Sequence, residues 1–211
     1  SMKKTFFVLT SLLFIIAMYL NVLPLGHEEV IKKISTYPFI KNFYLAGGTS
    51  LALQLGYRES VDFDFFSEQD FNPEELLNVL KNNFDVEDIT VAKGTLNCTV
   101  KGIKLQFLNY PYPLLEKFSD WDGINLSSII DVACTKMITV SVRGSKKDYI
   151  DIYYLLQTYS LEELFQKMDK KYKNLDFNKT HILKSLTYFG EADEQPMPRM
   201  HIETDWENVK S

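Results

Sequence analysis

The segment from Tyr44 to Ser67 constrains the fold of this chain more than any other. It contains an apolar run, a Gly-Gly-Thr-Ser turn, a helical run, and a second apolar run, VDFDFF, interrupted by two aspartates. Because side chains alternate between the two faces of a strand, Asp62 and Asp64 are expected on one face, opposite the phenylalanines that follow each of them. The segment therefore predicts a strand–turn–helix–strand unit with two like charges on an otherwise apolar strand.

Two carboxylates that share a strand face repel each other, and a divalent cation is the usual means of holding them together. Mg²⁺, or Mn²⁺ in its place, takes hard oxygen ligands, often one or two carboxylates with substrate phosphates completing the shell. Asp62 and Asp64 are therefore predicted as metal ligands. A solvated strand face over a core is the alternative explanation for the same alternation.

The turn formed by Gly47 and Gly48 is suited to an anion. Glycines let the backbone come close to a ligand, and the first N–H groups of a helix have no partner within it. The hydroxyl of Thr49 or Ser50 could add a hydrogen bond to a phosphate oxygen. One segment thus supplies both a phosphate cradle and a metal platform.

This combination resembles the signature of the nucleotidyltransferase superfamily, in which Gly-Gly or Gly-Ser is followed about a dozen residues later by Asp-x-Asp. From Phe43 to Leu156 the chain is more closely similar to the nucleotidyltransferase toxins of bacterial abortive-infection systems, the AbiEii/AbiGii type. A second stretch, DVACTKMITVSVRGSKKDYIDIYYLL, carries that similarity further. It matches the family at Lys136, Arg143, Lys147, Asp148 and Asp151.

The resemblance implies an α+β fold, with a polymerase-β-like core of a small mixed sheet flanked by helices and a helical C-terminal bundle. It also implies an enzyme that moves a nucleoside monophosphate from an NTP to an acceptor hydroxyl, with RNA, such as a tRNA end, as acceptor. The physiological role would be that of a toxin controlled by a cognate antitoxin protein.

The second stretch also has a physical interpretation of its own. Lys136 and Arg143, seven apart on a predicted helix, would share a face, and Asp148 with Asp151 would share a face near the start of the next helix. Basic side chains aimed at the Asp62/Asp64 site would neutralise triphosphate charge. The alternative is an ion-pair network that only joins the helices. We favour a mixed role, in which Lys136 touches substrate and Asp151 orients it.

The predictions for individual residues follow from both stretches. The residues predicted to act in catalysis are Asp62, Asp64, Lys136 and Asp151. Those predicted to bind the nucleotide are Gly47, Gly48, Thr49, Ser50, Arg58, Arg143 and Asp148.

One position departs from the superfamily pattern. Related enzymes place a third carboxylate on a later strand, and the matching position in GIKLQFLNY is Gln106, which cannot act as a base. A protein of this fold that binds nucleotide or a partner without catalysis is therefore the first alternative. Tyr57 replaces the usual histidine before Arg58, a milder departure.

The order of predicted elements divides the chain into four parts. Residues 1–26 are expected to form an apolar helix, 27–122 the αβ core with a three-strand meander, 123–190 the helical bundle, and 191–211 a polar tail over the surface. The apolar run near the N-terminus is short for a membrane span. We favour a packed helix and a cytoplasmic protein, and an exported or membrane-anchored interaction protein is the second alternative.

Composition sets further limits. The net charge of −5 gives no overall attraction to nucleic acid, so RNA contact would need a local basic patch. Candidates are Lys101, Lys104, Lys146, Lys147 and the run from Lys167 to Lys173, with Tyr110 and Tyr112 as a possible stacking edge. The two cysteines, in apolar surroundings, are expected as reduced thiols. The three histidines match no zinc-ligand spacing, so no zinc site is expected.

Overall fold

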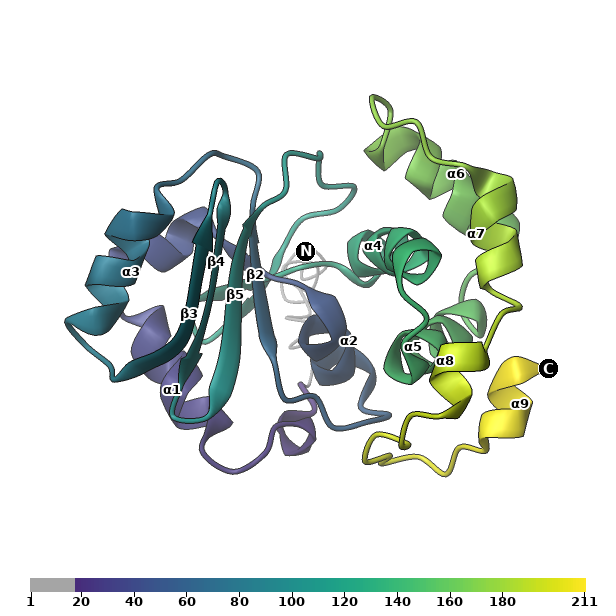
Figure 1. Ribbon diagram of the computed structural model, residues 1–211, viewed down its shortest axis with the longest axis horizontal. Coiled ribbons are helices and arrows are strands. Elements are labelled where there is room, and N and C mark those ends of the chain that lie inside the picture. The colour runs from purple at the N-terminus through teal and green to yellow at the C-terminus, as the bar shows by residue number, and fades with distance from the viewer. Residues whose placement is uncertain (1–17) are drawn as a thin grey trace, which may run out of the picture.

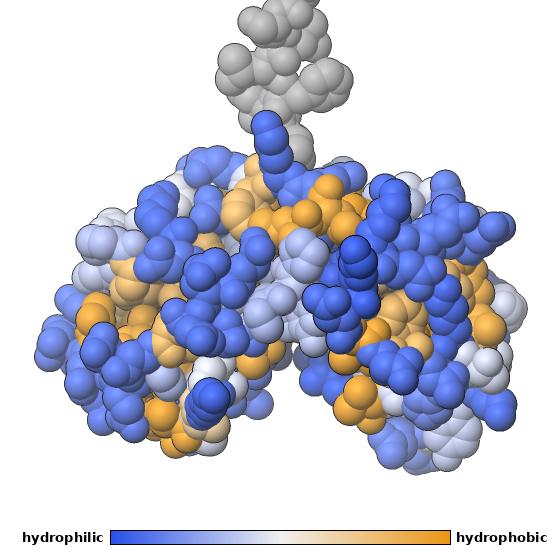
Figure 2. All heavy atoms as spheres, turned by 90° about the horizontal axis from the view of Figure 1, so that it is seen from above, coloured by the Kyte–Doolittle hydropathy of each residue, from blue (hydrophilic) through white to orange (hydrophobic). Residues whose placement is uncertain are grey.

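The computed structural model describes residues 18–211, in which a mixed sheet lies beside a helical half (Figure 1). Most of the predicted N-terminal helix, with the apolar run, lies outside the described residues. None of the helices formed by residues 18–211 has the length and apolar character needed to cross a membrane. Seen from above, the molecule has two lobes with an open notch between them (Figure 2).

Seven strands form one sheet in the order β3-β4-β5-β2-β1-β7-β6. Their bounds are β1 Tyr44–Leu45, β2 Phe63–Ser67, β3 Val86–Ala92, β4 Thr95–Val100, β5 Ile103–Asn109, β6 Ser119–Trp121 and β7 Ile124–Leu126. Strand β2 pairs parallel with β5 and antiparallel with β1, whereas β3, β4 and β5 form the predicted antiparallel meander. The α+β class and the mixed sheet are thus confirmed.

The sheet continues past the predicted boundary at residue 122. Strand β7 pairs parallel with β1, and the short β6–β7 hairpin closes that edge of the sheet. Each of these strands has only three residues, too few to show a period-two pattern in the sequence. The helical half therefore begins after Leu126.

Helices lie on both sides of the sheet. The bounds are α1 His27–Ser35, α2 Gly47–Leu55, α3 Pro73–Lys81, α4 Ile129–Val142, α5 Lys146–Leu156, α6 Leu161–Lys171, α7 Lys179–Ser185, α8 Gly190–Asp193 and α9 Trp206–Lys210, with 3₁₀ turns at Leu20–Val22 and Pro38–Asn42. Helices α1 and α3 cover one face, and α2 lies on the side that faces the helical half (Figure 1).

Local signals in the sequence fix several helix ends. Asn72 accepts hydrogen bonds from the backbone of Glu74 and Glu75, and Pro73 occupies the first helical position of α3. Gly56 ends α2 at φ 71°, a left-handed conformation that glycine adopts without steric cost. Both ends therefore depend on residues within the segment itself.

Two hydrophobic cores hold the halves, and α2 belongs to both. Phe63 and Phe65 are fully buried with α1 and α3 on one face of the sheet, together with Leu53 of α2. Leu51, on another side of α2, packs with the core of α4 and α5. Helix α2 is therefore held between the sheet and the helical half. This packing fixes where its N-terminus lies relative to the sheet. Cys98 and Cys134 are buried free thiols, as expected.

The polar segment 191–211 is an integral part of the fold. The backbone N–H of Glu59 donates to the carbonyl of Arg199, and that of His201 donates to Tyr57, both at 2.8 Å. Trp206 packs edge-on against Phe189. The segment does cover the surface, but it adds two short helices and pairs with the chain that leads into β2.

Candidate active site

The aspartates of the first stretch lie where the strand period predicts. Asp62 immediately precedes β2 and Asp64 is its second residue, and both line one cavity of about 490 Å³. Phe63 and Phe65 point into the core on the other face. Asp62 is 35% exposed, and its Oδ2 lies 3.5 Å from the Nζ of Lys147.

The glycine turn is pressed directly against this pair. Gly47, at φ 61°, is the first residue of α2, and a Cβ added there would collide with the carboxylate of Asp64. A Cβ on Gly48 would collide with the guanidinium of Arg58. The backbone N–H of Ala46 donates to the carbonyl of Asp64 at 2.7 Å. Only glycine lets the helix N-terminus come this close to the acidic pair.

Thr49 and Ser50, predicted to contact phosphate, face into the protein instead. Thr49 Oγ1 donates to the backbone carbonyl of Asp62 and lies 2.7 Å from the Ser60 hydroxyl. Ser50 Oγ donates to the carbonyl of Ser127 at 3.0 Å. Both side chains are buried, so these hydroxyls tie α2 to its neighbours, and the groups that the turn offers to an anion are its backbone N–H groups.

The charge of Asp64 is poorly compensated. Burial raises the pKa of its carboxyl, the nearby charge of Asp62 raises it further, and Lys136 acts in the opposite direction. No hydrogen bond or ion pair to this carboxylate is present among residues 18–211. A cation between the two aspartates would remove the repulsion, and their oxygens are of the kind that Mg²⁺ prefers.

Two carboxylates do not make a complete metal cage. Within residues 18–211, no group of three His, Cys, Asp or Glu side chains is placed to hold a metal ion. Mg²⁺ commonly completes its shell with water and phosphate oxygens, so the donor set fits a cation that binds together with a nucleotide. The same set lacks the nitrogen and sulfur ligands of a structural zinc site.

The second stretch forms a buried ion-pair network. Lys136 Nζ contacts Asp148 at 2.6 Å and Asp151 at 2.7 Å. Asp151 also accepts hydrogen bonds from Arg58 Nε at 2.7 Å, from Arg58 Nη2 at 2.9 Å and from the Tyr57 hydroxyl at 2.6 Å. Burial by itself would raise the pKa of Asp151, but Arg58 and Lys136 hold it well below its usual range. This carboxylate is therefore ionised and fully paired.

The network changes the roles expected for three basic residues. Arg58 is 3% exposed and lies beneath Gly48, so it supports the turn rather than meeting a nucleotide. Lys136 is paired with both aspartates, as expected for an ion-pair network that joins the helices. It also lines a second cavity of about 320 Å³. Arg143 lies one residue beyond the end of α4, in extended conformation, and not on the helix face predicted for it.

Arg143 is nevertheless held at the site. Its Nε donates to Asp148 Oδ2 at 3.1 Å, while the side chain remains 60% exposed. The two cavities share Asp64, Gln106 and Arg143, so these residues form their common wall. Gly47 and Lys136 line only the smaller cavity, which is otherwise mostly apolar.

Comparison with known proteins identifies the family. The AbiEii family, the nucleotidyl transferase AbiEii toxin of type IV toxin–antitoxin systems, matches residues 30–211. The chain belongs to this family. The protein is thus a nucleotidyltransferase, as the resemblance in its sequence implied.

This AbiEii-family protein is similar to one further sequence and to several solved structures. The uncharacterized protein aq_aa25 of Aquifex aeolicus (strain VF5) is 38% identical over 190 residues, 87% of this chain and 90% of its own. JHP933 from Helicobacter pylori is 17% identical, with a TM-score of 0.43 over 77% of this chain and 90% of its own. MenT4, the nucleotidyltransferase toxin Rv2826c of Mycobacterium tuberculosis H37Rv, is 18% identical, with a TM-score of 0.39 over 60% of this chain and 54% of its own.

Gln106 lies where the third carboxylate of the superfamily was expected. It pairs directly with Asp64 across the parallel β2–β5 ladder. Its Nε2 donates to Oδ1 of Asn97 on β4 at 3.0 Å. The prediction of this position is confirmed, and the AbiEii-family site therefore has a neutral amide beside Asp64.

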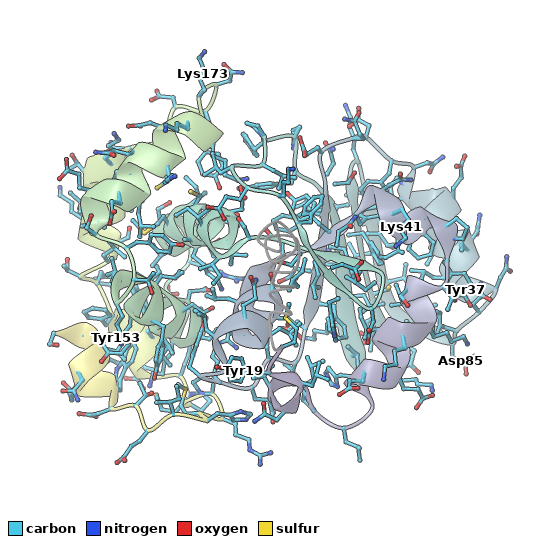
Figure 3. The ribbon with its side chains drawn as sticks, turned by 180° about the vertical axis from the view of Figure 1, so that it is seen from behind. Tyr19, Tyr37, Lys41, Asp85, Tyr153 and Lys173 are labelled. Carbon is cyan, nitrogen blue, oxygen red and sulfur yellow. The ribbon has the colours of Figure 1, made fainter. Side chains whose placement is uncertain are left out.

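Three of the lysines considered for RNA contact are engaged elsewhere. Lys146 is buried, with its Nζ 4.8 Å from the centre of the Trp206 ring. Lys171 is buried and pairs with Asp131 at 2.7 Å. Lys173 projects from the tip of the helical half (Figure 3). The run from 167 to 173 is therefore not a single basic surface.

The remaining candidates divide by position. Lys101 pairs with Glu29 at 2.7 Å on an exposed surface, and the hydroxyls of Tyr110 and Tyr172 lie 2.6 Å apart between the halves. Lys104 lines the larger cavity with the two aspartates. Lys104 and the exposed Lys147 are thus the predicted basic residues nearest the site.

One site residue was missed by sequence reasoning. Asp88 lines the larger cavity together with Asp62 and Asp64, although it lies on the edge strand β3. In the structure Val86 and Val91 both pack on the core, although residues five apart on a regular strand point to opposite faces. That spacing indicates a bulge between them.

Proposed function

We propose that this protein is a Mg²⁺-dependent transferase that moves a nucleoside monophosphate from an NTP to a hydroxyl of RNA, such as the end of a tRNA. The observation that supports it is the contact between the glycine turn at the N-terminus of α2 and Asp64, which lines both cavities and shares the larger one with Asp62. An acidic pair and an anion-binding helix end have little reason to meet except around a metal–phosphate ligand.

Each group has a role in this proposal. Asp62 and Asp64 would hold Mg²⁺ or Mn²⁺, which supplies charge neutralisation at the phosphates of the bound nucleotide. The free N–H groups of the first turn of α2 would bind the terminal phosphates. Arg143, exposed and fixed by Asp148, would reach the same phosphates from the side of the helical half.

The reaction itself is a displacement at phosphorus. An oxygen of the acceptor forms a bond to the α-phosphorus, the bond from that phosphorus to the α,β-bridging oxygen breaks, and pyrophosphate leaves with the electron pair. The hydroxyl proton is released to a base or to solvent. Gln106 cannot take that proton, because its amide has no basic site near neutral pH.

The biological setting is part of the same proposal. A transferase of a toxin family that uses NTP and RNA would act in the cytoplasm, where both are abundant, and would need a cognate antitoxin to restrain it. Production of the chain alone is expected to arrest growth, and coproduction of its antitoxin is expected to restore growth.

The test is label transfer. Purified protein, Mg²⁺ and total tRNA are incubated with each α-³²P-labelled NTP in turn, beside the Asp62→Ala/Asp64→Ala variant. Asp70→Ala, on the exposed loop after β2, is the matched control. Label on RNA with wild type and control only would support the proposal and name the nucleotide.

Other outcomes would contradict it. Label on RNA from the double variant would remove the aspartates from the site. NTP binding by calorimetry without label on any acceptor would favour the alternative of a nucleotide-binding protein that has lost turnover, with Gln106 as the residue to explain.

A further inference from the structure

A row of polar side chains runs across the sheet from the aspartates. The ladders place Asp64 of β2 beside Gln106 of β5, and Gln106 beside Asn97 of β4. These residues, with Lys104 and Asp88, line the larger cavity of about 490 Å³. The cavity therefore extends from the acidic pair over the open face of the sheet towards its edge strand.

A bulge in the edge strand β3 places Asp88 at the wall of this cavity. Glu87 pairs with Thr99 and Thr90 pairs with Asn97, so the register shifts between them. Asp88, inside the shift, has φ 49°, an uncommon conformation for a residue other than glycine. Bulges redirect side chains, and here the bulge brings Asp88 to the cavity wall.

The geometry of the transfer reaction suggests a different ligand for each of the two cavities. In a displacement at phosphorus the attacking and leaving oxygens lie roughly in line, on opposite sides of the phosphorus. The glycine turn, which would hold the leaving phosphates, lines only the smaller cavity. The acceptor must then approach from the other side of Asp64, where the larger cavity lies.

We propose that the larger cavity binds the terminal nucleoside of the RNA acceptor, with its hydroxyl directed at Asp62 and Asp64. This inference rests on the proposed function and deepens it. A nucleoside end presents hydroxyl and amino donors, which suit the acceptor oxygens of Asp88. Asp88, which is not part of the proposed metal pair, adds a negative charge that disfavours a triphosphate at its end of the cavity.

The other lining groups fit the same ligand. The amides of Asn97 and Gln106 carry both donors and acceptors, as the edge of a base requires. Lys104 is exposed and would contact the phosphate that joins the terminal nucleoside to the rest of the strand. The cavity thus has the acidic pair on β2, Asp88 on the edge strand β3, and a cation for the backbone of a single strand.

The test uses two variants and two neighbours as controls. Asp88→Asn removes the charge, and asparagine tolerates the left-handed conformation at this position, so the bulge is retained. Glu87→Gln is its control, one residue away and outside the cavity. Lys104→Ala is compared with Lys101→Ala, whose lysine is exposed on the same hairpin but pairs with Glu29.

Lys104→Ala and Asp88→Asn are each expected to raise the KM for RNA about tenfold and to leave the KM for NTP unchanged. The two control variants are expected to have the KM values of wild type. Binding of a fluorescent single-stranded RNA without NTP should weaken in parallel. For Lys104→Ala the slope of log K against log salt should also fall by about 0.7.

The outcomes separate the two proposals. Wild-type labelling of RNA with unchanged RNA KM in both variants would overturn the acceptor site alone. Absence of labelling by wild type would overturn the proposed function, and the RNA-binding titration would still decide whether this cavity holds RNA. Label on a protein acceptor instead of RNA would overturn both.

Discussion

The pair Asp62 and Asp64 and the pair Asp148 and Asp151 have opposite surroundings. Asp62 and Asp64 face a cavity from a strand, and the pKa of Asp64 is raised by burial and by its neighbour. Asp148 and Asp151 lie in the first turns of α5 and are fully buried, yet Lys136, Arg58 and Arg143 surround them. The pKa of Asp151 is lowered despite its burial, since its paired cations outweigh the desolvation.

The difference shows that one pair of carboxylates is neutralised within the protein, whereas the other is left available for a ligand. The buried pair uses the basic residues of the second stretch to join α4, α5 and the segment that follows α2. The cavity pair is left with little compensation inside the protein, and a cation with a nucleotide would supply it. The first pair should therefore govern activity and the second pair stability.

The largest effect is expected from Asp64→Asn. Loss of a metal ligand should reduce transfer at least about 1,000-fold, about 4 kcal/mol. The melting temperature without Mg²⁺ should rise by about 2–4 °C, because an uncompensated charge is removed from beside Asp62. Label transfer and a thermal melt measure both. A drop in melting temperature would show that Asp64 is structural instead.

Asp151→Asn, in contrast, should lower the stability of the protein. Arg58 and Lys136 would lose the shared carboxylate that neutralises them, at a cost of about 3–5 kcal/mol in the free energy of unfolding. Urea denaturation measures this. The matched control is Asp169→Asn, which breaks an exposed pair with Lys179 and should cost at most about 1 kcal/mol. Equal losses in the two variants would mean that the buried network contributes no more than a surface pair.

Gly47→Ala tests the close approach of the turn to the cavity pair. The new methyl group would displace the Asp64 carboxylate, and transfer should fall about 100-fold, which corresponds to about 3 kcal/mol. Gly102→Ala is the control, since Gly102 also has positive φ but has free space around it. Both variants should lose about 1 kcal/mol of stability, and only Gly47→Ala should lose activity. Full activity in Gly47→Ala would separate the turn from the site.

The smallest expected effect is a difference in pH dependence. The folded-state pKa of Asp151 lies below its unfolded value of about 3.9, so its stabilisation is complete above that pH and is lost as pH falls below it. Urea denaturation at pH 7, 4 and 3 should show a steeper loss in wild type than in Asp151→Asn. Parallel curves would show that Asp151 does not contribute to acid sensitivity.

The sequence predicted most of what depends on local pattern. The period of two placed both aspartates of VDFDFF on one face. The resemblance to the superfamily also placed Gln106 beside the acidic pair, and the β2–β5 pairing brings it next to Asp64. The three-residue strands β6 and β7 escaped prediction, since their pairing depends on β1 and not on their own residues.

Side-chain partners were predicted less well. Arg58, Thr49 and Ser50 carry polar groups in a motif that suggests a ligand, yet all three are satisfied inside the protein. Their partners Asp151, Ser60 and Ser127 lie on other segments, and no local pattern specifies such contacts. Asp88 was missed for the same reason, because a bulge acquires meaning only when the strand order brings it to the cavity.

The sequence by itself determined the strand–turn–helix–strand unit, the pair of carboxylates on one strand face and the family to which the chain belongs. These depend on backbone geometry and on spacing within a few residues, where the chain has few alternatives. Only the tertiary structure decided which charges are neutralised within the protein and which face the cavity. That decision depends on burial and on partners from distant segments, and both arise only when the sheet and the helical half are packed together.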